Sequence, residues 1–166
     1  MPQEITRTQI EKYTVYTGPT AESFSPSMTG ITYPDPAYEI LVYRRPLCVF
    51  EYVLSGRGHI ERNGSILTVN AGDAYILTAG TYHHYYSDKV DPWTKIWFNV
   101  SGSLVQHLLS DYGLDGVTLI PGMSPIMDAM ATVSACGITL LGTFPFLHLL
   151  IAVLKRPLGH LARLLS

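Results

Sequence analysis

The predicted fold rests on residues 53–98, which read VLSGRGHIERNGSILTVNAGDAYILTAGTYHHYYSDKVDPWTKIWF. Short segments in which apolar and polar residues alternate indicate strands with one buried face. Turn residues separate these segments, and Asn63-Gly64 is the clearest hairpin signal because both positions tolerate positive φ. Strands that recur about every eight to twelve residues, with turns between them, are typical of an all-β barrel or sandwich.

The flanking residues extend this pattern on both sides. Arg45-Pro46 interrupts the first strands because proline donates no ladder hydrogen bond, and Gly56-Arg57-Gly58 predicts a turn. Residues 1–30 show no sustained periodicity, so we expect an irregular N-terminal arm there. The expected strands are residues 38–44, 48–55, 59–62, 66–69, 75–78, 82–86 and 93–100.

The spacing of apolar residues becomes helical after Gly102. Leucines and other apolar residues from Leu104 to Tyr112 recur at helical spacing, and Gly113 supplies a C-terminal stop. A brief extended segment at residues 117–120 is expected next, followed by helices at about residues 125–135 and 145–155. The sequence thus predicts an arm (1–30), a β-barrel (31–102) and a C-terminal α-helical subdomain (103–166).

Composition limits the classes of function. Hydrophobic residues make up 47% of the chain and charged residues 14%, which argues against disorder. The formal net charge of −2 gives no basic footprint for nucleic acid within these residues. Cys48 and Cys136 form no CxxC motif, as expected of buried, reduced thiols in a cytosolic protein. The polar N-terminus resembles neither a signal peptide nor a transit peptide, so we expect a cytoplasmic protein.

Residues 129–154 contain no Asp, Glu, Lys or Arg, and by length alone they could span a bilayer. Gly137, Gly142 and Pro145 interrupt this segment and divide it into two shorter helices. We therefore expect helices that are buried against the core or against a partner subunit, and no membrane contact. A membrane-tethered sensor remains the alternative for this segment.

Several motifs resemble known families. Gly72-Asp73, followed by residues 79–83 (AGTYH), is similar to the second conserved motif of the cupin fold, although Thr78 stands where that motif has proline. Three longer runs carry a second resemblance: RRPLCVFEYVLSGRGHIERNG (44–64), AGDAYILTAGTYHHYYSD (71–88) and DPWTKIWFNVSG (91–102). They are similar to the N-terminal ligand-binding and dimerisation domain of AraC-type transcription regulators, over about residues 30–125. The resemblance implies a mainly β, cupin-like (double-stranded β-helix or jelly-roll) barrel with C-terminal α-helices.

The cupin resemblance raises the question of a metal. The positions where metallo-cupins carry their first ligands fall near Tyr43, Arg45 and Val49, none of which suits a usual ligand set. His83 could supply one ligand, but a divalent-metal site needs three or four donors. Glu51 and Glu61 could contribute, although strand alternation could also turn both toward solvent. We expect no catalytic residue, no metal and no cofactor.

The ligand-binding residues that we expect come from residue chemistry and from the AraC-type resemblance. A guanidinium inside a barrel needs partners and suits hydroxyl or carboxylate oxygens, and Arg45 matches the position that hydrogen-bonds a sugar in the arabinose regulator. Tyr85 and Trp97 match pocket positions, where an aromatic face can stack on a sugar ring. Lys95 falls at a polar pocket position, and Thr32 matches on the arm side. The alternatives are ordinary barrel packing for Tyr85 and Trp97 and a surface position for Arg45.

Two histidines are adjacent, so His83 and His84 should point to opposite faces of a strand. The cupin motif favours His83 as the inward one, either as a ligand contact or as a hydrogen-bonded core histidine. Trp93 begins a strand after Pro92 and is expected to pack in the core. The binding residues expected in the barrel are Arg45, Tyr85, Lys95, Trp97, His83 and Thr32.

The resemblance implies an effector-binding and dimerisation domain rather than an enzyme. The expected partners are a small-molecule effector, with a carbohydrate as the first candidate, and a second copy bound through the C-terminal helices. DNA contact would require a helix-turn-helix domain that these 166 residues do not contain. The alternative is a small cupin enzyme, such as a sugar isomerase, an epimerase or a metal-dependent dioxygenase.

Overall fold

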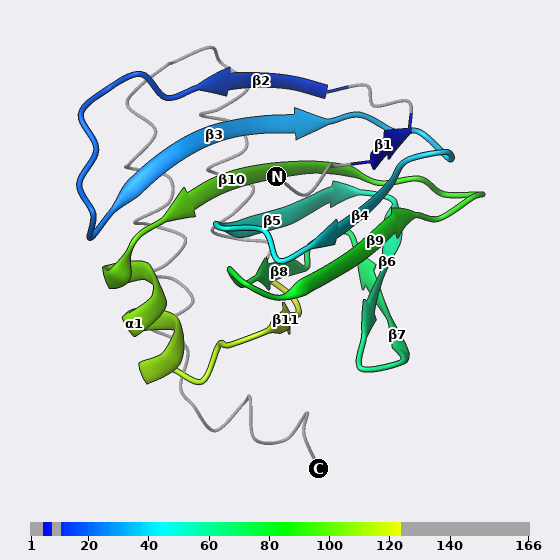
Figure 1. Ribbon diagram of the computed structural model, residues 1–166. Helices are drawn as coiled ribbons and strands as arrows, with labels where there is room; N and C mark the ends of the chain where they lie inside the picture. The colour runs from blue at the N-terminus through cyan, green and yellow to red at the C-terminus, as the bar shows by residue number, and fades with distance from the viewer. Residues whose placement is uncertain (1–4, 8–10, 124–166) are drawn as a thin grey trace.

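The computed structural model describes residues 5–7 and 11–123 and contains eleven strands and one helix in that part of the chain (Figure 1). The elements are β1 (Ile5–Arg7), β2 (Glu11–Val15), β3 (Ser25–Thr32), β4 (Glu39–Tyr43), β5 (Cys48–Ser55), β6 (Arg57–Arg62), β7 (Ser65–Asn70), β8 (Ala74–Leu77), β9 (Tyr82–Ser87), β10 (Thr94–Ser101), α1 (Ser103–Asp111) and β11 (Val117–Ile120).

The strands form two antiparallel sheets that face one another. One sheet has the order β1-β4-β9-β6-β7, and the other has the order β11-β8-β5-β10-β3-β2. Figure 1 shows α1 at one end of the β10 strand, outside the space between the sheets. This arrangement confirms the predicted mainly β, barrel-like fold with helix after it. The predicted helix at residues 104–112 is α1, and the strands at 48–55 and 117–120 have the predicted bounds.

Turn chemistry sets the register of the five-stranded sheet. Asn63 and Gly64 have φ of 50° and 76° and join β6 to β7 as a two-residue hairpin, as predicted. The predicted turn at Gly56-Arg57-Gly58 is shorter than expected, because β6 already begins at Arg57. Gly58 is a strand residue whose missing side chain lets the ring of Trp93 lie against the backbone. Gly56, with φ of 68°, is the turn residue, whereas Gly58 marks a close approach of Trp93 to the backbone.

The prediction of an irregular arm over residues 1–30 is wrong for residues 5–7, 11–15 and 25–30, which form strands. β2 and β3 are the outermost pair of the six-stranded sheet, and β3 pairs with β10 along its whole length. The sequence of β3, SPSMTGIT, carries small polar residues and little apolar alternation, so periodicity could not reveal it. Its strand conformation comes from the ladder with β10, because strand preference depends on tertiary context.

Two hydrophobic clusters lie on opposite faces of the six-stranded sheet. One fills the space between the sheets, where β5 and β10 contribute residues such as Val49, Val53 and Trp97. The other lies on the outer face, where Phe50 and Tyr52 of β5 pack with α1 and β11. The alternation of side chains along β5 therefore serves both clusters. Cys48 is buried in the outer cluster as a free thiol, as predicted.

Several predictions fall outside the described residues. These are the helices expected beyond residue 123, the charge-free segment 129–154 and Cys136, and the division into arm, barrel and helical subdomain stays a prediction. Among residues 5–7 and 11–123, no helix is long and apolar enough to cross a membrane.

Candidate functional site

The space between the two sheets contains a buried ion pair. Lys95 of β10 is 0% exposed and Glu51 of the neighbouring strand β5 is 2% exposed. The Lys95 ammonium donates to Glu51 Oε2, and its distance to the Tyr75 hydroxyl oxygen is 3.1 Å. Tyr75 in turn donates to the same carboxylate oxygen at 2.5 Å. Three strands that are hydrogen-bonded neighbours, β8, β5 and β10, thus each supply one member of this network.

Aromatic rings surround the ammonium on its remaining sides. The Lys95 Nζ atom lies 4.4 Å from the ring centroid of Tyr85 and 4.6 Å from those of Tyr38 and Trp93. Rings at this distance attract a cation through the negative charge density of their faces. Lys95 and Tyr85, which were predicted as binding residues, therefore lie in direct contact.

Burial makes each charge of the pair costly. Desolvation lowers the pKa of Lys95, and the nearby Glu51 carboxylate opposes that shift. Burial also raises the pKa of Tyr75, and the adjacent Glu51 charge adds to this shift. The neutral phenol is therefore the hydrogen-bond donor in the network. A buried pair of this kind is stable only when further hydrogen bonds and ring contacts complete it.

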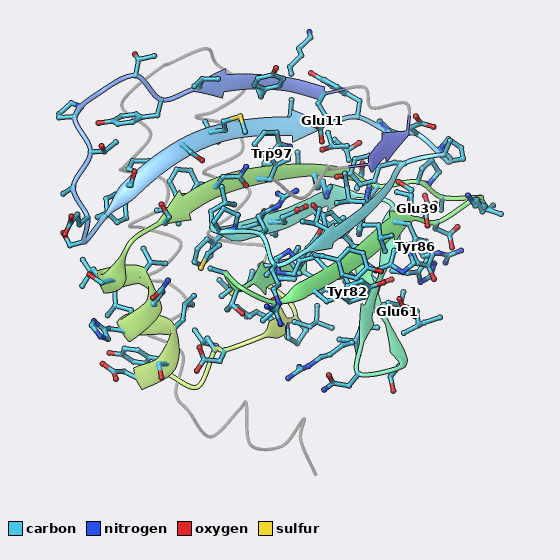
Figure 2. The ribbon with its side chains drawn as sticks, viewed as in Figure 1. Glu11, Glu39, Glu61, Tyr82, Tyr86 and Trp97 are labelled. Atoms are coloured by element: carbon cyan, nitrogen blue, oxygen red, sulfur yellow. The ribbon has the colours of Figure 1, made fainter. Side chains whose placement is uncertain are left out.

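A second group of predicted residues lies where β10, β3 and β2 meet. Trp97 Nε1 donates to the Thr32 hydroxyl at 3.1 Å, and that hydroxyl donates to Glu11 Oε1 at 2.8 Å. The ring of Tyr13 in β2 lies 6.4 Å from that of Trp97, centroid to centroid. Figure 2 shows Glu11 above Trp97 at the β2 edge of the sheet. β2 therefore covers Thr32 and Trp97, which are 0% and 9% exposed.

His83 is fully buried and points inward, as predicted. Its Nε2 lies 3.0 Å from the carbonyl oxygen of Thr78, so this nitrogen carries the proton and donates. Burial lowers the pKa of His83 to about 4, and the charge of Arg45 contributes to the shift. The neutral ring leaves Nδ1 as an acceptor, and Nδ1 has no hydrogen-bond partner among the described residues.

Arg45 occupies the turn between β4 and β5 and is half-buried. Its carbonyl accepts a hydrogen bond from Gly80 N at 2.8 Å, which fixes the turn against the one between β8 and β9. The guanidinium lowers the pKa of both His83 and Lys95, so its positive charge acts on the barrel interior. Arg45 is therefore the predicted binding residue that lies nearest to solvent.

His84 points to the opposite face from His83, as predicted. Its Nδ1 lies 2.6 Å from Glu61 Oε2 and its Nε2 lies 2.9 Å from Glu39 Oε1. Figure 2 shows Glu39, Glu61, Tyr82 and Tyr86 together on this outer side of the five-stranded sheet. Partial burial opposes protonation of His84, but the two carboxylates outweigh it and raise the pKa. This cluster joins β4, β9 and β6 from the outside.

The residues predicted from the sequence include most of the buried polar side chains between the sheets. They do not include the buried carboxylate of Glu51. Strand alternation allows Glu51 to face solvent, but the structure buries it beside Lys95. A signal was present, since Glu51 is the only charged residue of CVFEYVLS and Lys95 is the only one of TKIWFNVS. Tyr75 and Tyr38 were also missed. Trp93 is core, as predicted.

A metal centre does not fit the described part of the chain. In residues 5–7 and 11–123, no three His, Cys, Asp or Glu side chains gather in a way that could hold a metal ion. Glu51, the acid nearest the interior, is already bound by Lys95 and Tyr75. The interior is therefore organised around hydrogen bonding, charge and aromatic faces.

Comparison with known proteins gives partial matches of low identity. The Msm operon regulatory protein of Streptococcus mutans serotype c is 32% identical over 66 residues. This match covers 40% of the present chain and spans only 24% of the length of that relative.

Solved cupin structures resemble the fold at lower identity. A Cupin 2 conserved barrel domain protein from Salinispora arenicola is 14% identical, covers 62% of this chain and 84% of that one, and has a TM-score of 0.43. The Cnp3 cupin domain of Schizosaccharomyces pombe is 12% identical, covers 66% and 75%, and has a TM-score of 0.44.

The family model of the AraC-like ligand binding domain matches residues 25–135. These residues include β3 to β11 and every binding residue that the sequence predicted. The match extends over more than half of the 166 residues. The chain therefore belongs to the family of AraC-like ligand binding domains, the cupin-type domains of transcription regulators.

Proposed function

We propose that this chain is the effector-binding and dimerisation domain of a transcription regulator and binds a small polar molecule inside the barrel. The observation that carries the proposal is the gathering of buried polar groups between the sheets, with Arg45 at the solvent side. A sugar is the first ligand class to test, because Trp97 offers an aromatic face and Arg45 a fork of donors.

The residues of the proposed site differ in how available they are to a ligand. Two of the three N–H groups of Lys95 are directed at Glu51 and Tyr75, so a ligand would meet this ammonium only by competing with them. Thr32 and Trp97 are held by β2, whose placement a ligand can change. We therefore propose Arg45, Thr32 and Trp97 as the main contacts, with Tyr85, Lys95 and His83 shaping the charge and the wall of the site.

β2 is the element through which we propose that binding is transmitted. A ligand that hydrogen-bonds Thr32 competes with Glu11, and one that stacks on Trp97 competes with Tyr13. Such a ligand has different affinities for the chain with β2 in place and with β2 displaced, which is what shifting the equilibrium requires. In a full-length regulator, this change would reach helix-turn-helix DNA-binding domains outside these 166 residues.

A thermal-shift screen of monosaccharides and small carboxylic acids tests the binding proposal. A ligand at a hundred times its dissociation constant adds about 2.7 kcal/mol of stability, or about 5–10 °C for a domain of this size. Arg45→Ala should abolish the shift. Arg44→Asn is the matched control, because Arg44 is the exposed neighbour and asparagine tolerates its φ of 54°. A shift that survives Arg45→Ala would contradict the assignment of Arg45.

Dimerisation is tested separately by light scattering on the 166-residue chain without detergent. The expected mass is twice that of one chain, and a monomer at micromolar concentration would contradict this part of the proposal. The alternative class, a cupin enzyme, would be favoured by stoichiometric iron, manganese or zinc in the purified chain.

A further inference from the structure

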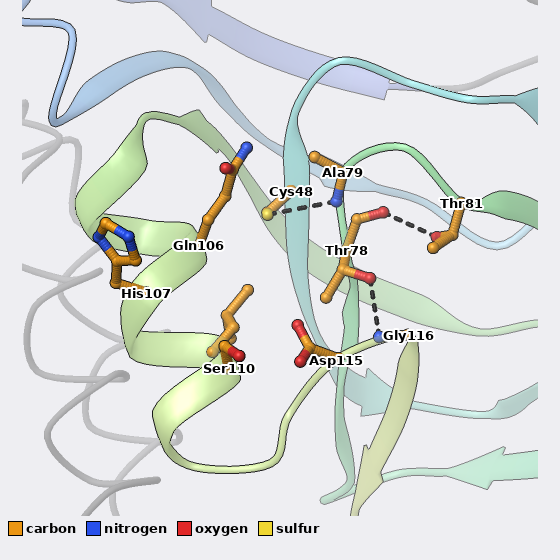
Figure 3. A pocket seen from close by; sticks show the side chains of 10 residues that line it. Cys48, Thr78, Ala79, Thr81, Gln106, His107, Ser110, Asp115 and Gly116 are labelled. Atoms are coloured by element: carbon orange, nitrogen blue, oxygen red, sulfur yellow. Dashed lines mark hydrogen bonds between the residues drawn. The ribbon is translucent and has the colours of Figure 1, made fainter.

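A cavity that is open to solvent lies outside the space between the sheets. It has a volume of about 440 Å³ and is bordered by α1, the turn between β8 and β9, and the loop between α1 and β11 (Figure 3). Cys48 of β5 forms part of the wall. Ligand pockets for small molecules have volumes of about 300–1,000 Å³, so this cavity can hold a molecule of monosaccharide size.

Hydrogen bonds fix the wall opposite α1. Thr78 Oγ1 accepts from the backbone N–H of Gly116 at 2.8 Å, which ties β8 to the loop before β11. Thr81 Oγ1 donates to the Thr78 carbonyl at 2.8 Å, and Cys48 Sγ accepts from Ala79 N at 3.4 Å. The cavity is therefore formed before any ligand arrives, which lowers the entropic cost of binding.

The cavity carries one carboxylate. Its lining contains the exposed side chain of Asp115 and no lysine or arginine, and His107 of α1 is the other titratable residue of the lining. Within the described part of the chain, Asp115 makes no hydrogen bond or ion pair. Figure 3 shows its carboxylate pointing toward the space that α1 borders. A carboxylate in this position attracts a cation and repels an anion.

Apart from His107, the other polar side chains of the lining are neutral hydrogen-bonding groups. Ser110 and Gln106 come from α1, and Thr81 comes from the β8–β9 turn. Hydroxyl and amide groups can both donate to and accept from the hydroxyls of a ligand. We propose that this cavity is a second ligand site, separate from the barrel interior, for a small hydroxylated ammonium compound of the amino-sugar class.

Amide NMR on the ¹⁵N-labelled 166-residue chain tests the proposal, with glucosamine as the probe and glucose and N-acetylglucosamine as uncharged comparisons. Glucosamine should shift the amide signals of Ala79 and Gly116 saturably, and the uncharged sugars should bind at least about tenfold more weakly, as a charge-assisted hydrogen bond is worth about 1.5–3 kcal/mol.

Asp115→Asn keeps the size of the side chain and should weaken glucosamine binding about tenfold or more. Asp111→Asn is the matched control, because Asp111 is an exposed carboxylate at the end of α1 that does not line the cavity. Three results would each overturn the site: no saturable shift with glucosamine, equal binding of glucosamine and glucose, or unchanged affinity in Asp115→Asn. Shifts confined to the indole signals of Trp93 and Trp97 would also overturn it, because they would place the ligand in the barrel interior. The proposed barrel site can fail or hold independently of all these outcomes.

Discussion

At the scale of single residues, Lys95 and Glu51 are tolerated in the interior only as a pair. Removing one partner leaves a buried charge without compensation, which costs about 3–5 kcal/mol. We therefore expect Lys95→Met to lower the free energy of unfolding by about that amount, measured by urea denaturation at pH 7. The double variant Lys95→Met with Glu51→Gln should recover most of the loss, since a glutamine oxygen can still accept from Tyr75.

The double-mutant cycle distinguishes a coupled pair from two independent residues. If the effects of Lys95→Met and Glu51→Gln simply add, the ion pair does not organise the interior. A neutral surface change, Lys89→Met, is the control for the loss of a lysine, because Lys89 is exposed and its ammonium donates only to a backbone carbonyl among the described residues.

His83 should make the protein sensitive to acid. Its folded pKa of about 4 lies below the usual value of 6.5, so protonation favours the unfolded chain. Its contribution to stability is full above pH 6.5 and is lost as the pH falls toward 4, by about 3 kcal/mol at 1.36 kcal/mol per pKa unit. We expect His83→Gln, whose amide can still donate to Thr78, to lose less stability than the native chain over this window. The free energy of unfolding of both chains is measured by urea titration at pH 7, 5.5 and 4. An equal decrease in the native chain and in His83→Gln would contradict this assignment.

At the scale of elements, the sequence predicted the strands that have a local residue pattern. It missed the strands whose conformation depends on backbone hydrogen bonds to a neighbouring strand. β4 to β10 were found because runs of β-forming residues lie between turn residues; buried side chains alternate along β4 and β9 but are continuous along most of β5 and all of β8. β3 was missed because its ladder with β10 and the packing of Gly30 on Trp97 stabilise it, and neither leaves a local pattern. The residues predicted to bind a ligand come from a resemblance: Lys95 and Trp97 share a strand face that a resemblance can mark, whereas the partner charge of Glu51 becomes visible only when β5 and β10 are paired.

Gly30 should control the position of β2. A Cβ atom at this position would lie 2.6 Å from Trp97 Cζ2 and 2.7 Å from the Lys12 carbonyl oxygen, so β2 or the indole must move. We expect Gly30→Ala to destabilise the chain by about 1–3 kcal/mol, as overpacking does, and to increase acrylamide quenching of tryptophan fluorescence. Gly18→Ala is the matched control, because the three atoms nearest to its Cβ would be the ring end of Tyr16, which is held only by an exposed hydrogen bond of 3.4 Å to the Pro19 carbonyl among the described residues. Unchanged quenching in Gly30→Ala would show that β2 does not cover Trp97.

At the scale of the whole molecule, β5 and β10 belong to both hydrophobic clusters. Along β5, Phe50 and Tyr52 face the outer cluster, while Val49 and Val53 face the barrel interior. Neither cluster can lose its packing without disturbing the strand that supports the other. The proposed barrel site and the proposed cavity beside α1 therefore lie on one structural unit, and a ligand at either should stabilise both.

We accordingly expect the two clusters to unfold in a single transition, with one urea midpoint for two probes. Tryptophan fluorescence reports the barrel interior, because Trp93 and Trp97 both lie there. Thiol labelling reports the outer cluster through Cys48, whose pKa burial raises, so that it reacts slowly until the cluster opens. Labelling uses a Cys136→Ser chain, in which Cys48 is the remaining thiol. A labelling midpoint at clearly lower urea than the fluorescence midpoint would show that α1 and the outer cluster open alone, and would separate the cavity from the barrel as an independent unit.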